Sequence, residues 1–172
     1  MKIEKVFRVL NSLERRGLVE RYAVGGGMAS LFYMEPFLTY DLDVFVFFPM
    51  AKKGLVDINP IYEYLRNEGY RLKREHVIIE GLPVQFIPAY NDLVKEAVTE
   101  ATEIKYKGVR TRVLRAEHLL VIMLQTNRPK DKVRITQMLD QAEIDPGYVD
   151  GILKRHRLRQ KWLEFKRRFY GE

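Results

Sequence analysis

The chain contains no cysteine. This absence excludes disulfide bonds and thiolate metal sites, so any bound metal must take oxygen or imidazole ligands. The sequence also lacks an apolar run of 18 residues, and its N-terminal residues lack the apolar segment of a signal peptide. A chain of 172 residues with 47% hydrophobic and 31% charged residues is typical of a soluble globular protein. We therefore expect a cytoplasmic protein without a membrane partner.

Positive charge is concentrated near the C-terminus of a chain whose net charge is +7. The basic residues of this region are Lys154, Arg155, Arg157, Arg159, Lys161, Lys166, Arg167 and Arg168. A basic helix can bind phosphate backbones, such as those of tRNA or another RNA, or an acidic partner. The alternative is a solvated helix face that keeps the protein soluble, and the charge alone leaves both interpretations open.

The order of the predicted elements indicates an α+β protein. Apolar residues at helical spacing predict helices over 2–16, 28–34, 57–67 and 91–98. Short apolar and β-branched runs predict strands over 18–24, 41–48, 76–80, 83–88, 103–106 and 109–114. Helical patterns over 116–126, 130–142, 146–156 and 158–170 follow. We expect a small mixed sheet with packed helices in a domain over 1–114, followed by a C-terminal helical region over 115–172.

Three consecutive glycines precede a pair of aspartates. Gly25, Gly26 and Gly27 follow a short apolar run, and Asp41 and Asp43 open a predicted strand. Side chains two residues apart on a strand point the same way, so this spacing predicts two carboxylates in one small volume. Carboxylates that close repel each other unless a cation lies between them. The glycines allow a backbone or a phosphate group to approach closely.

This combination of glycines, a short helix and Asp-x-Asp on a buried strand resembles the signature of the nucleotidyltransferase superfamily, which includes the palm of DNA polymerase beta. The resemblance implies that Gly25, Gly26 and Gly27 bind the triphosphate of an NTP. It implies that Asp41 and Asp43 are catalytic and hold Mg²⁺ or Mn²⁺, which offsets the charge that develops on the phosphates. The implied reaction is nucleotidyl transfer from the NTP to a hydroxyl group of RNA or protein.

A longer pattern is similar to the AbiEii-type group of nucleotidyltransferase-like proteins. Thr39 lies two residues before the first aspartate, and Arg128, Lys130 and Asp131 match a later stretch of that group. The group includes toxins of toxin–antitoxin systems, which implies a cognate antitoxin as a partner. The resemblance implies that Arg128 and Lys130 are nucleotide-binding residues that hold phosphates. Alternatively, Lys130 and Asp131 start a helix, where an acidic residue near the N-terminus is favourable.

Two positions depart from the pattern of active members. Gln85 stands where a third carboxylate usually helps to bind metal and takes the proton of the attacking hydroxyl. Met123 stands where the group has a lysine in its cleft, although a methionine also suits an apolar helix core. Glu80 either replaces the missing acid or lies exposed at a hairpin end. Two functions therefore remain: a metal-dependent nucleotidyltransferase, or a catalytically weakened module that binds nucleotide, RNA or a partner protein.

Overall fold

The computed structural model describes residues 2–49 and 57–171 and contains a seven-stranded mixed sheet. The strands follow the order β3-β4-β5-β2-β1-β7-β6 across the sheet. Their bounds are β1 Arg21–Gly25, β2 Leu42–Phe47, β3 Arg71–Lys73, β4 His76–Ile79, β5 Leu82–Pro88, β6 Thr102–Tyr106 and β7 Val109–Val113. β2 runs parallel to β5 and β1 runs parallel to β7, while the other neighbouring strands are antiparallel. The predicted α+β class with a mixed sheet is confirmed.

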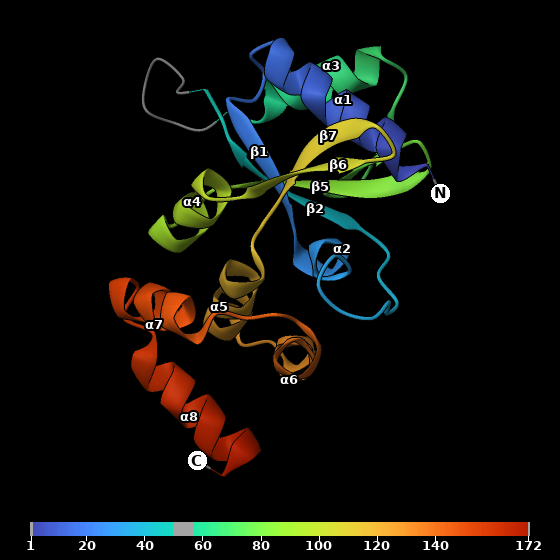
Figure 1. Ribbon diagram of the computed structural model, residues 1–172. Helices are drawn as coiled ribbons and strands as arrows, with labels where there is room; N and C mark the ends of the chain where they lie inside the picture. Colours follow the sequence, from blue (N-terminus) through green and yellow to red (C-terminus); the bar gives the residue numbers. More distant parts are fainter. Residues whose placement is uncertain (1, 50–56, 172) are drawn as a thin grey trace.

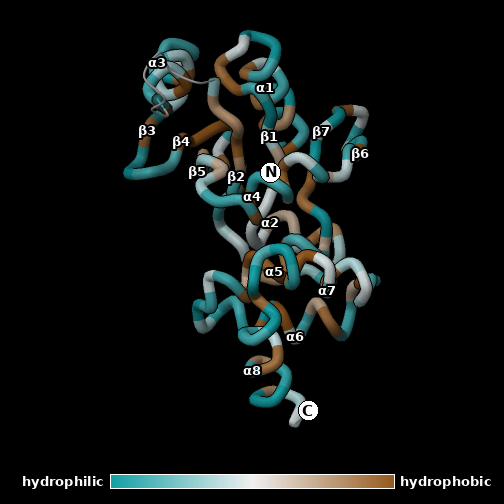
Figure 2. The backbone as a smooth tube through the Cα atoms, turned by 90° about the vertical axis from the view of Figure 1, so that its left-hand side faces the viewer, coloured by the Kyte–Doolittle hydropathy of each residue, from teal (hydrophilic) through white to brown (hydrophobic). Residues whose placement is uncertain are grey.

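The helices are divided between the two faces of the sheet (Figure 1). Their bounds are α1 Ile3–Arg15, α2 Gly26–Ser30, α3 Asn59–Asn67, α4 Asp92–Thr99, α5 Ala116–Thr126, α6 Pro129–Gln141, α7 Pro146–Arg155 and α8 Arg159–Tyr170. The helices α1 and α3 cover one face, whereas α2 and the helical region from α5 onwards lie towards the other (Figure 1). Hydrophobic segments follow the central strands and α5, and hydrophilic segments lie outside them (Figure 2).

Local sequence accounts for most of these elements. The buried side of α1 is formed by residues at helical spacing, among them Phe7 and Leu10. Lys107 and Gly108, with φ angles of 45° and 82°, form the tight turn predicted between β6 and β7. Asn91 begins α4 as predicted, because its side chain accepts a hydrogen bond from the backbone N–H of Val94 at 2.8 Å.

Several boundaries differ from the prediction. The helix expected over 28–34 begins earlier, at Gly26, and continues after Ser30 only as a turn. The strand expected from Asp41 begins at Leu42, so Asp41 lies just outside the sheet. Strand β3 was not predicted, because it has only three residues, all exposed, and a run that short gives no clear strand pattern.

The helical region begins directly after β7. Its first helix, α5, is buried along most of its length and contacts α2, α4, α6, α7 and α8. The chain passes from sheet to helices at Leu114 and Arg115, where the division into two domains was predicted, and that division stays a prediction. Within 2–49 and 57–171, no helix has the length and hydropathy needed to cross a membrane.

Candidate active site

Asp43 lines a cleft of about 260 Å³ between the sheet and helices α5 and α6. Its neighbours in register are Gly25 on β1 and Gln85 on β5. The residues that line the cleft are Gly26, Asp43, Phe45, Gln85, Ile87, Tyr90, Leu114, Leu119, Ile122, Met123, Thr126, Arg128, Asp131 and Arg134. Paired residues on neighbouring strands project to the same face. Gln85 therefore stands beside Asp43, at the position where the family pattern has a third carboxylate.

Each of the three glycines leaves room for a different neighbour. A Cβ atom on Gly25 would lie 2.3 Å from a ring carbon of Phe45, so this glycine is required by packing. A Cβ atom on Gly26 would lie 1.8 Å from Oδ2 of Asp43, and the φ angle of Gly26 is +59°. On Gly27 the same atom would lie 2.9 Å from Oγ1 of Thr39. Gly26 is thus the glycine whose missing side chain leaves room for the carboxylate of Asp43.

The carboxylate of Asp43 has an unfavourable environment for its charge. Burial, followed by repulsion from Asp41, raises the pKa of Asp43 above its usual value. The positive charges of Arg128, Lys130 and Arg134 act in the opposite direction. Among the residues that the structure describes, none donates a hydrogen bond to this carboxylate or forms a salt bridge with it. Asp43 therefore has free oxygen lone pairs in a partly desolvated cleft, which is the condition that favours a cation ligand.

Asp41 points towards a different part of the same face. Its Oδ2 atom lies 3.7 Å from Nε2 of His76 on β4. It lines a second cavity, of about 350 Å³, rather than the cleft around Asp43. The two aspartates remain close enough for their charges to interact, but they border neighbouring cavities. The expected single volume with both carboxylates is not formed, because the chain has left the strand geometry at Asp41.

The stretch that begins at Arg128 starts helix α6 and also borders the cleft, while its phosphate-binding role stays a prediction. Asp131 accepts hydrogen bonds from the backbone N–H of Arg128 at 3.1 Å and from Thr126 at 2.7 Å, so it caps the start of α6. It also holds the guanidinium of Arg128, whose Nε lies 2.8 Å from Oδ2. Arg128 still lines the cleft and its charge reaches Asp43, as does that of Lys130.

Arg134 is a cleft residue that the sequence did not reveal. Its guanidinium lies 4.8 Å from the ring centroid of Phe37. A Cβ atom added to Gly27 would lie 3.0 Å from the same guanidinium, so Arg134 packs against the glycine turn. The only sequence signal is its position four residues after Lys130, which places both on one side of α6. Met123 is 7% exposed and lines the apolar wall of the same cleft, so it is both a core and a cleft residue.

Glu80 does not take the place of the missing acid. It lies in the turn between β4 and β5 with a φ angle of 51°, where its carboxylate forms an ion pair with Lys5 at 3.4 Å. The turn is made by Glu80 and Gly81, one residue earlier than predicted, because Leu82 already belongs to β5. The interpretation of Glu80 as a residue at a hairpin end is therefore the correct one.

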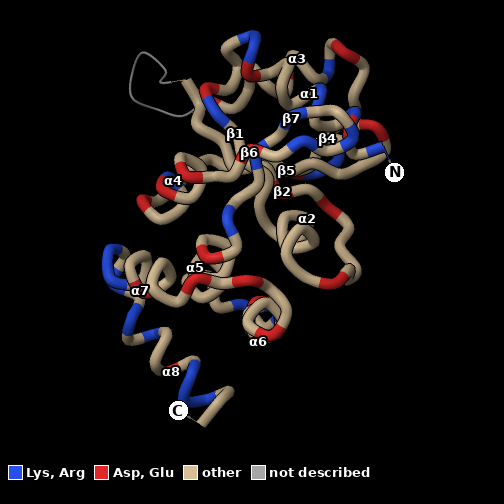
Figure 3. The backbone as a smooth tube through the Cα atoms, viewed as in Figure 1, with Lys and Arg blue, Asp and Glu red and all other residues tan. Residues whose placement is uncertain are grey.

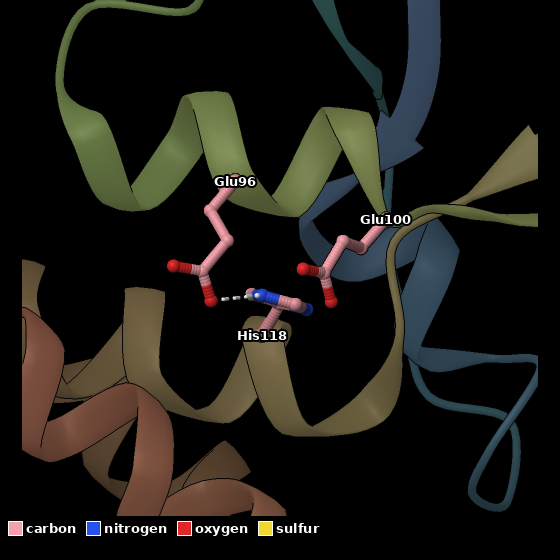
Figure 4. Close-up of side chains that lie close together, drawn as sticks. All are labelled: Glu96, Glu100 and His118. Atoms are coloured by element: carbon pink, nitrogen blue, oxygen red, sulfur yellow. Dashed lines mark hydrogen bonds and ion pairs between the residues drawn. The ribbon is translucent and has the colours of Figure 1, made fainter.

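A second group of potential ligands lies away from the cleft, between α4 and α5. Glu96, Glu100 and His118 each offer one ligand atom within 4.8 Å of the others (Figure 4). Glu96 already accepts a hydrogen bond from Arg155 at 2.7 Å and pairs with His156 at 2.8 Å. Because a guanidinium already neutralises Glu96, we interpret this group as a polar network that joins α4, α5 and α7.

Replacing Glu96 with glutamine is expected to destabilise the protein by about 1–3 kcal/mol, because buried His118 and half-buried His156 then lose a charged partner. The hydrogen bond from Arg155 chiefly lowers the pKa of Glu96, from 4.5 to about 2. Its stabilising contribution is therefore complete above pH 4.5 and lost as the pH falls towards 2. Urea unfolding at pH 7 and pH 4 measures the difference. Glu63→Gln on exposed α3 is the control, and an equal loss in both variants would contradict the network.

Comparison with known proteins identifies the architecture. No protein-family model and no curated sequence matches the chain. An antigenic nucleotidyltransferase-like protein from Paracoccidioides brasiliensis has a TM-score of 0.55 at 15% identity, over 81% of this chain and 76% of that one. The complex of ANT(2'')-Ia with adenylyl-2''-tobramycin has a TM-score of 0.53 at 18% identity, over 91% and 96% of the two chains. The chain has a nucleotidyltransferase fold.

The match to this fold extends over the helical region. The solution structure of the antibiotic-resistance factor ANT(2'')-Ia has a TM-score of 0.54 at 16% identity and covers 98% of both chains. At these identities the similarity establishes the fold, and the chemistry has to be argued from the site. In this nucleotidyltransferase fold, the strand with Asp43, the glycine turn and the cationic side of α6 enclose one cleft.

Proposed function

We propose that the protein transfers a nucleotidyl group from an NTP to a hydroxyl acceptor with the help of Mg²⁺ or Mn²⁺. The observation that most strongly supports this function is the position of Asp43. Its carboxylate is unpaired and partly buried, and it lies beside Gly26 and near the cations of α6. In the reaction, the acceptor oxygen forms a bond to the α-phosphorus and the bond to the β-phosphate oxygen breaks. Pyrophosphate leaves, and the hydroxyl proton passes to solvent.

The residues around Asp43 suit a hard divalent cation. Asp43 offers carboxylate oxygens, and Gln85 offers an amide oxygen in register with Asp43. Asp41 offers a further carboxylate at the border of the neighbouring cavity. The raised pKa of Asp43 supports this assignment, since a cation would relieve both causes of the shift. When bound, the ion supplies charge neutralisation for the transferred phosphoryl group. The protein itself positions the NTP and excludes water with the apolar wall around Met123.

The cationic side of the cleft fits a triphosphate. Arg128 and Arg134 line it, and the charge of Lys130 reaches Asp43 in its centre. Guanidinium groups bind phosphate oxygens in a bidentate manner, which fixes the orientation of the substrate. Gly26 and Gly27 lie close to this side, since a Cβ atom would come within 1.8 Å of Asp43 on Gly26 and within 3.0 Å of Arg134 on Gly27. We assign the triphosphate to the cleft along this cationic side.

Thermal unfolding tests the metal and nucleotide site directly. With Mg²⁺ or Mn²⁺ present, at least one of ATP, CTP, GTP and UTP is expected to raise the melting temperature, by the equivalent of about 2.7 kcal/mol at 100 times Kd. EDTA should remove the shift, since the triphosphate is bound through the metal. If no NTP changes the melting temperature of the wild type in either metal, the proposal is wrong.

The second candidate is a module that binds nucleotide, RNA or a partner protein without catalysis, and Gln85 and Met123 favour it. The variant Gln85→Glu separates the two. In an enzyme, a third carboxylate beside Asp43 is expected to strengthen Mg²⁺ binding on the order of 10-fold and to increase the transfer rate. In a binding module, the metal affinity rises but transfer stays absent. Metal titration and transfer of labelled nucleotide measure both effects, with Gln85→Met as the uncharged control.

The narrower resemblance to AbiEii-type toxins remains a prediction. It would give the protein a cognate antitoxin and a role in a toxin–antitoxin system. Growth arrest on expression of the wild type, absent with an Asp43→Asn variant, would support that role. If expression of the active enzyme does not affect growth, the toxin role is wrong, whereas the proposed nucleotidyl transfer is not contradicted.

A further inference from the structure

A row of polar side chains crosses four strands on the face of the sheet that carries Asp43. Asp43 on β2 pairs with Gln85 on β5. On the next strand, His76 lies one step beyond the pair Val77–Val84, which places it opposite Gln85. Lys73 on β3 pairs with His76 in turn. Because residues paired in register project to one face, the row continues from the proposed nucleotide cleft to the edge of the sheet.

The second cavity lies over the outer part of this row. Its lining residues are Tyr40, Asp41, Lys73, Arg74, Glu75, His76, Ile78 and Pro83. Ile78 and Pro83 are themselves a pair on β4 and β5, so the floor of the cavity is the same sheet face that carries Asp43. Its volume of about 350 Å³ is at the small end of ligand pockets, large enough for one terminal unit of a longer molecule. The nucleotide cleft and this cavity are therefore neighbours, with Asp41 at the border.

The opposite charges of the second cavity do not pair with each other among the described residues. Its two carboxylates both face the ring of His76, with Asp41 at 3.7 Å from Nε2 and Glu75 at 3.8 Å from Nδ1. Lys73 and Arg74 have no ion-pair partner among residues 2–49 and 57–171. Nε2 of His76 is buried and has no hydrogen-bond partner in the same part of the chain. Two cations that form no ion pair, next to a ring nitrogen without a hydrogen-bond partner, favour a molecule that carries both an anionic group and a hydroxyl group.

We propose that the second cavity binds the acceptor and that the acceptor is the hydroxyl end of a single-stranded RNA. This inference rests on the proposed nucleotidyl transfer. Lys73 and Arg74 bind the terminal phosphodiester, and the end hydroxyl lies between Asp41 and His76, where its oxygen faces the nucleotide cleft. The side chain of Tyr40 is 72% exposed at the rim and offers a surface on which a base stacks.

RNA fits this cavity better than the other acceptors. A protein hydroxyl offers no phosphate for Lys73 and Arg74. An aminoglycoside such as tobramycin offers protonated amines to Asp41 and Glu75 but no anionic group to the two cations. Lys and Arg residues are frequent along α7 and α8 near the C-terminus, away from the sheet (Figure 3). Two of them form ion pairs already, since Arg155 pairs with Glu96 and Arg159 with Asp150. Lys73 and Arg74 of the β3–β4 hairpin form no ion pair among the described residues, and they line the second cavity.

The double variant Lys73→Ala/Arg74→Ala tests the cavity. With a short single-stranded RNA as acceptor, KM for the RNA is expected to rise about 10-fold or more, because two phosphate contacts are lost. The metal-dependent stabilisation by NTP should not change. The control Arg8→Ala/Lys105→Ala removes the same charge from exposed positions outside both cavities. Equal effects of the two double variants on KM would overturn the proposal.

A crosslink locates the RNA end independently of turnover. An RNA with 4-thiouridine at its 3′ end is expected to crosslink to a peptide that contains Tyr40 or the β3–β4 hairpin. A crosslink confined to α7 or α8 would contradict the proposal, as would transfer to tobramycin or protein but not to RNA. Failure of the NTP stabilisation would instead contradict the nucleotidyl-transfer function, and the crosslink would still report whether RNA binds in this cavity.

Discussion

Replacing Asp43 with asparagine is expected to reduce nucleotidyl transfer about 10³-fold while raising the melting temperature of the ligand-free protein. The loss of activity follows from removing a charge that offsets the transition state, for which single groups contribute factors of this size. The gain in stability follows because burial and the charge of Asp41 both disfavour an ionised group at this position. Opposite effects on activity and stability distinguish a functional carboxylate from a structural one.

The pH dependence of stability shows whether the ionised form of Asp43 destabilises the folded protein. Since the folded protein raises the pKa of Asp43 above 3.8, the folded state binds the proton more tightly than the unfolded state. Its contribution to stability is therefore complete below pH 3.8 and lost as the pH rises through the higher folded value. Thermal unfolding from pH 4 to pH 7 should show a smaller decrease in Asp43→Asn than in the wild type. Asp140→Asn, at an exposed position of α6, is the control.

Replacing Gly26 with alanine is expected to abolish metal-dependent NTP binding. The added Cβ atom would lie 1.8 Å from Oδ2 of Asp43, so the carboxylate must leave its position beside the cleft. The positive φ angle of Gly26 adds about 1–2 kcal/mol of backbone strain. Calorimetric titration with NTP and Mg²⁺ measures the binding, and urea unfolding measures the loss of stability.

Gly17→Ala is the matched control for that experiment. Gly17 has a φ angle of +70°, and a Cβ atom added there would meet no other atom within 4 Å. The variant should therefore suffer a similar strain without a collision and retain full NTP binding. If both variants bound NTP equally well, the contact between the glycine turn and Asp43 would have no role in the site.

The fold was predictable because its decisive features are local. Glycines before a short helix, two aspartates at a strand and a tight turn at Lys107 and Gly108 are all properties of neighbouring residues. The contribution of Arg134 was not predictable in this way. The hydrophobic pattern of α6 shows which side packs inwards but not which polar residue meets the glycine turn on a distant strand.

The arrangement of the site depends on the order of strands. His76 and Asp41 are 35 positions apart and meet because β5 lies between β4 and β2. No sequence pattern specifies that order. In the same way, Glu96 and His156 belong to helices that meet only after the helical region has packed against α4. Sequence analysis thus found Asp43 and its glycines, but it could not separate the surroundings of Asp41 from those of Asp43.

The buried carboxylate of Asp131 has a consequence for how Arg128 would bind an anion. Asp131 is 0% exposed and holds Arg128 by two side-chain hydrogen bonds at 2.8 and 3.1 Å. A guanidinium fixed in this way needs no reordering when a phosphate arrives, so little side-chain entropy is lost on binding. Its charge is also partly compensated in advance, which weakens its hold on a free anion. In the proposed reaction, the corner between α5 and α6 would therefore orient a triphosphate at a small entropic cost and bind pyrophosphate weakly.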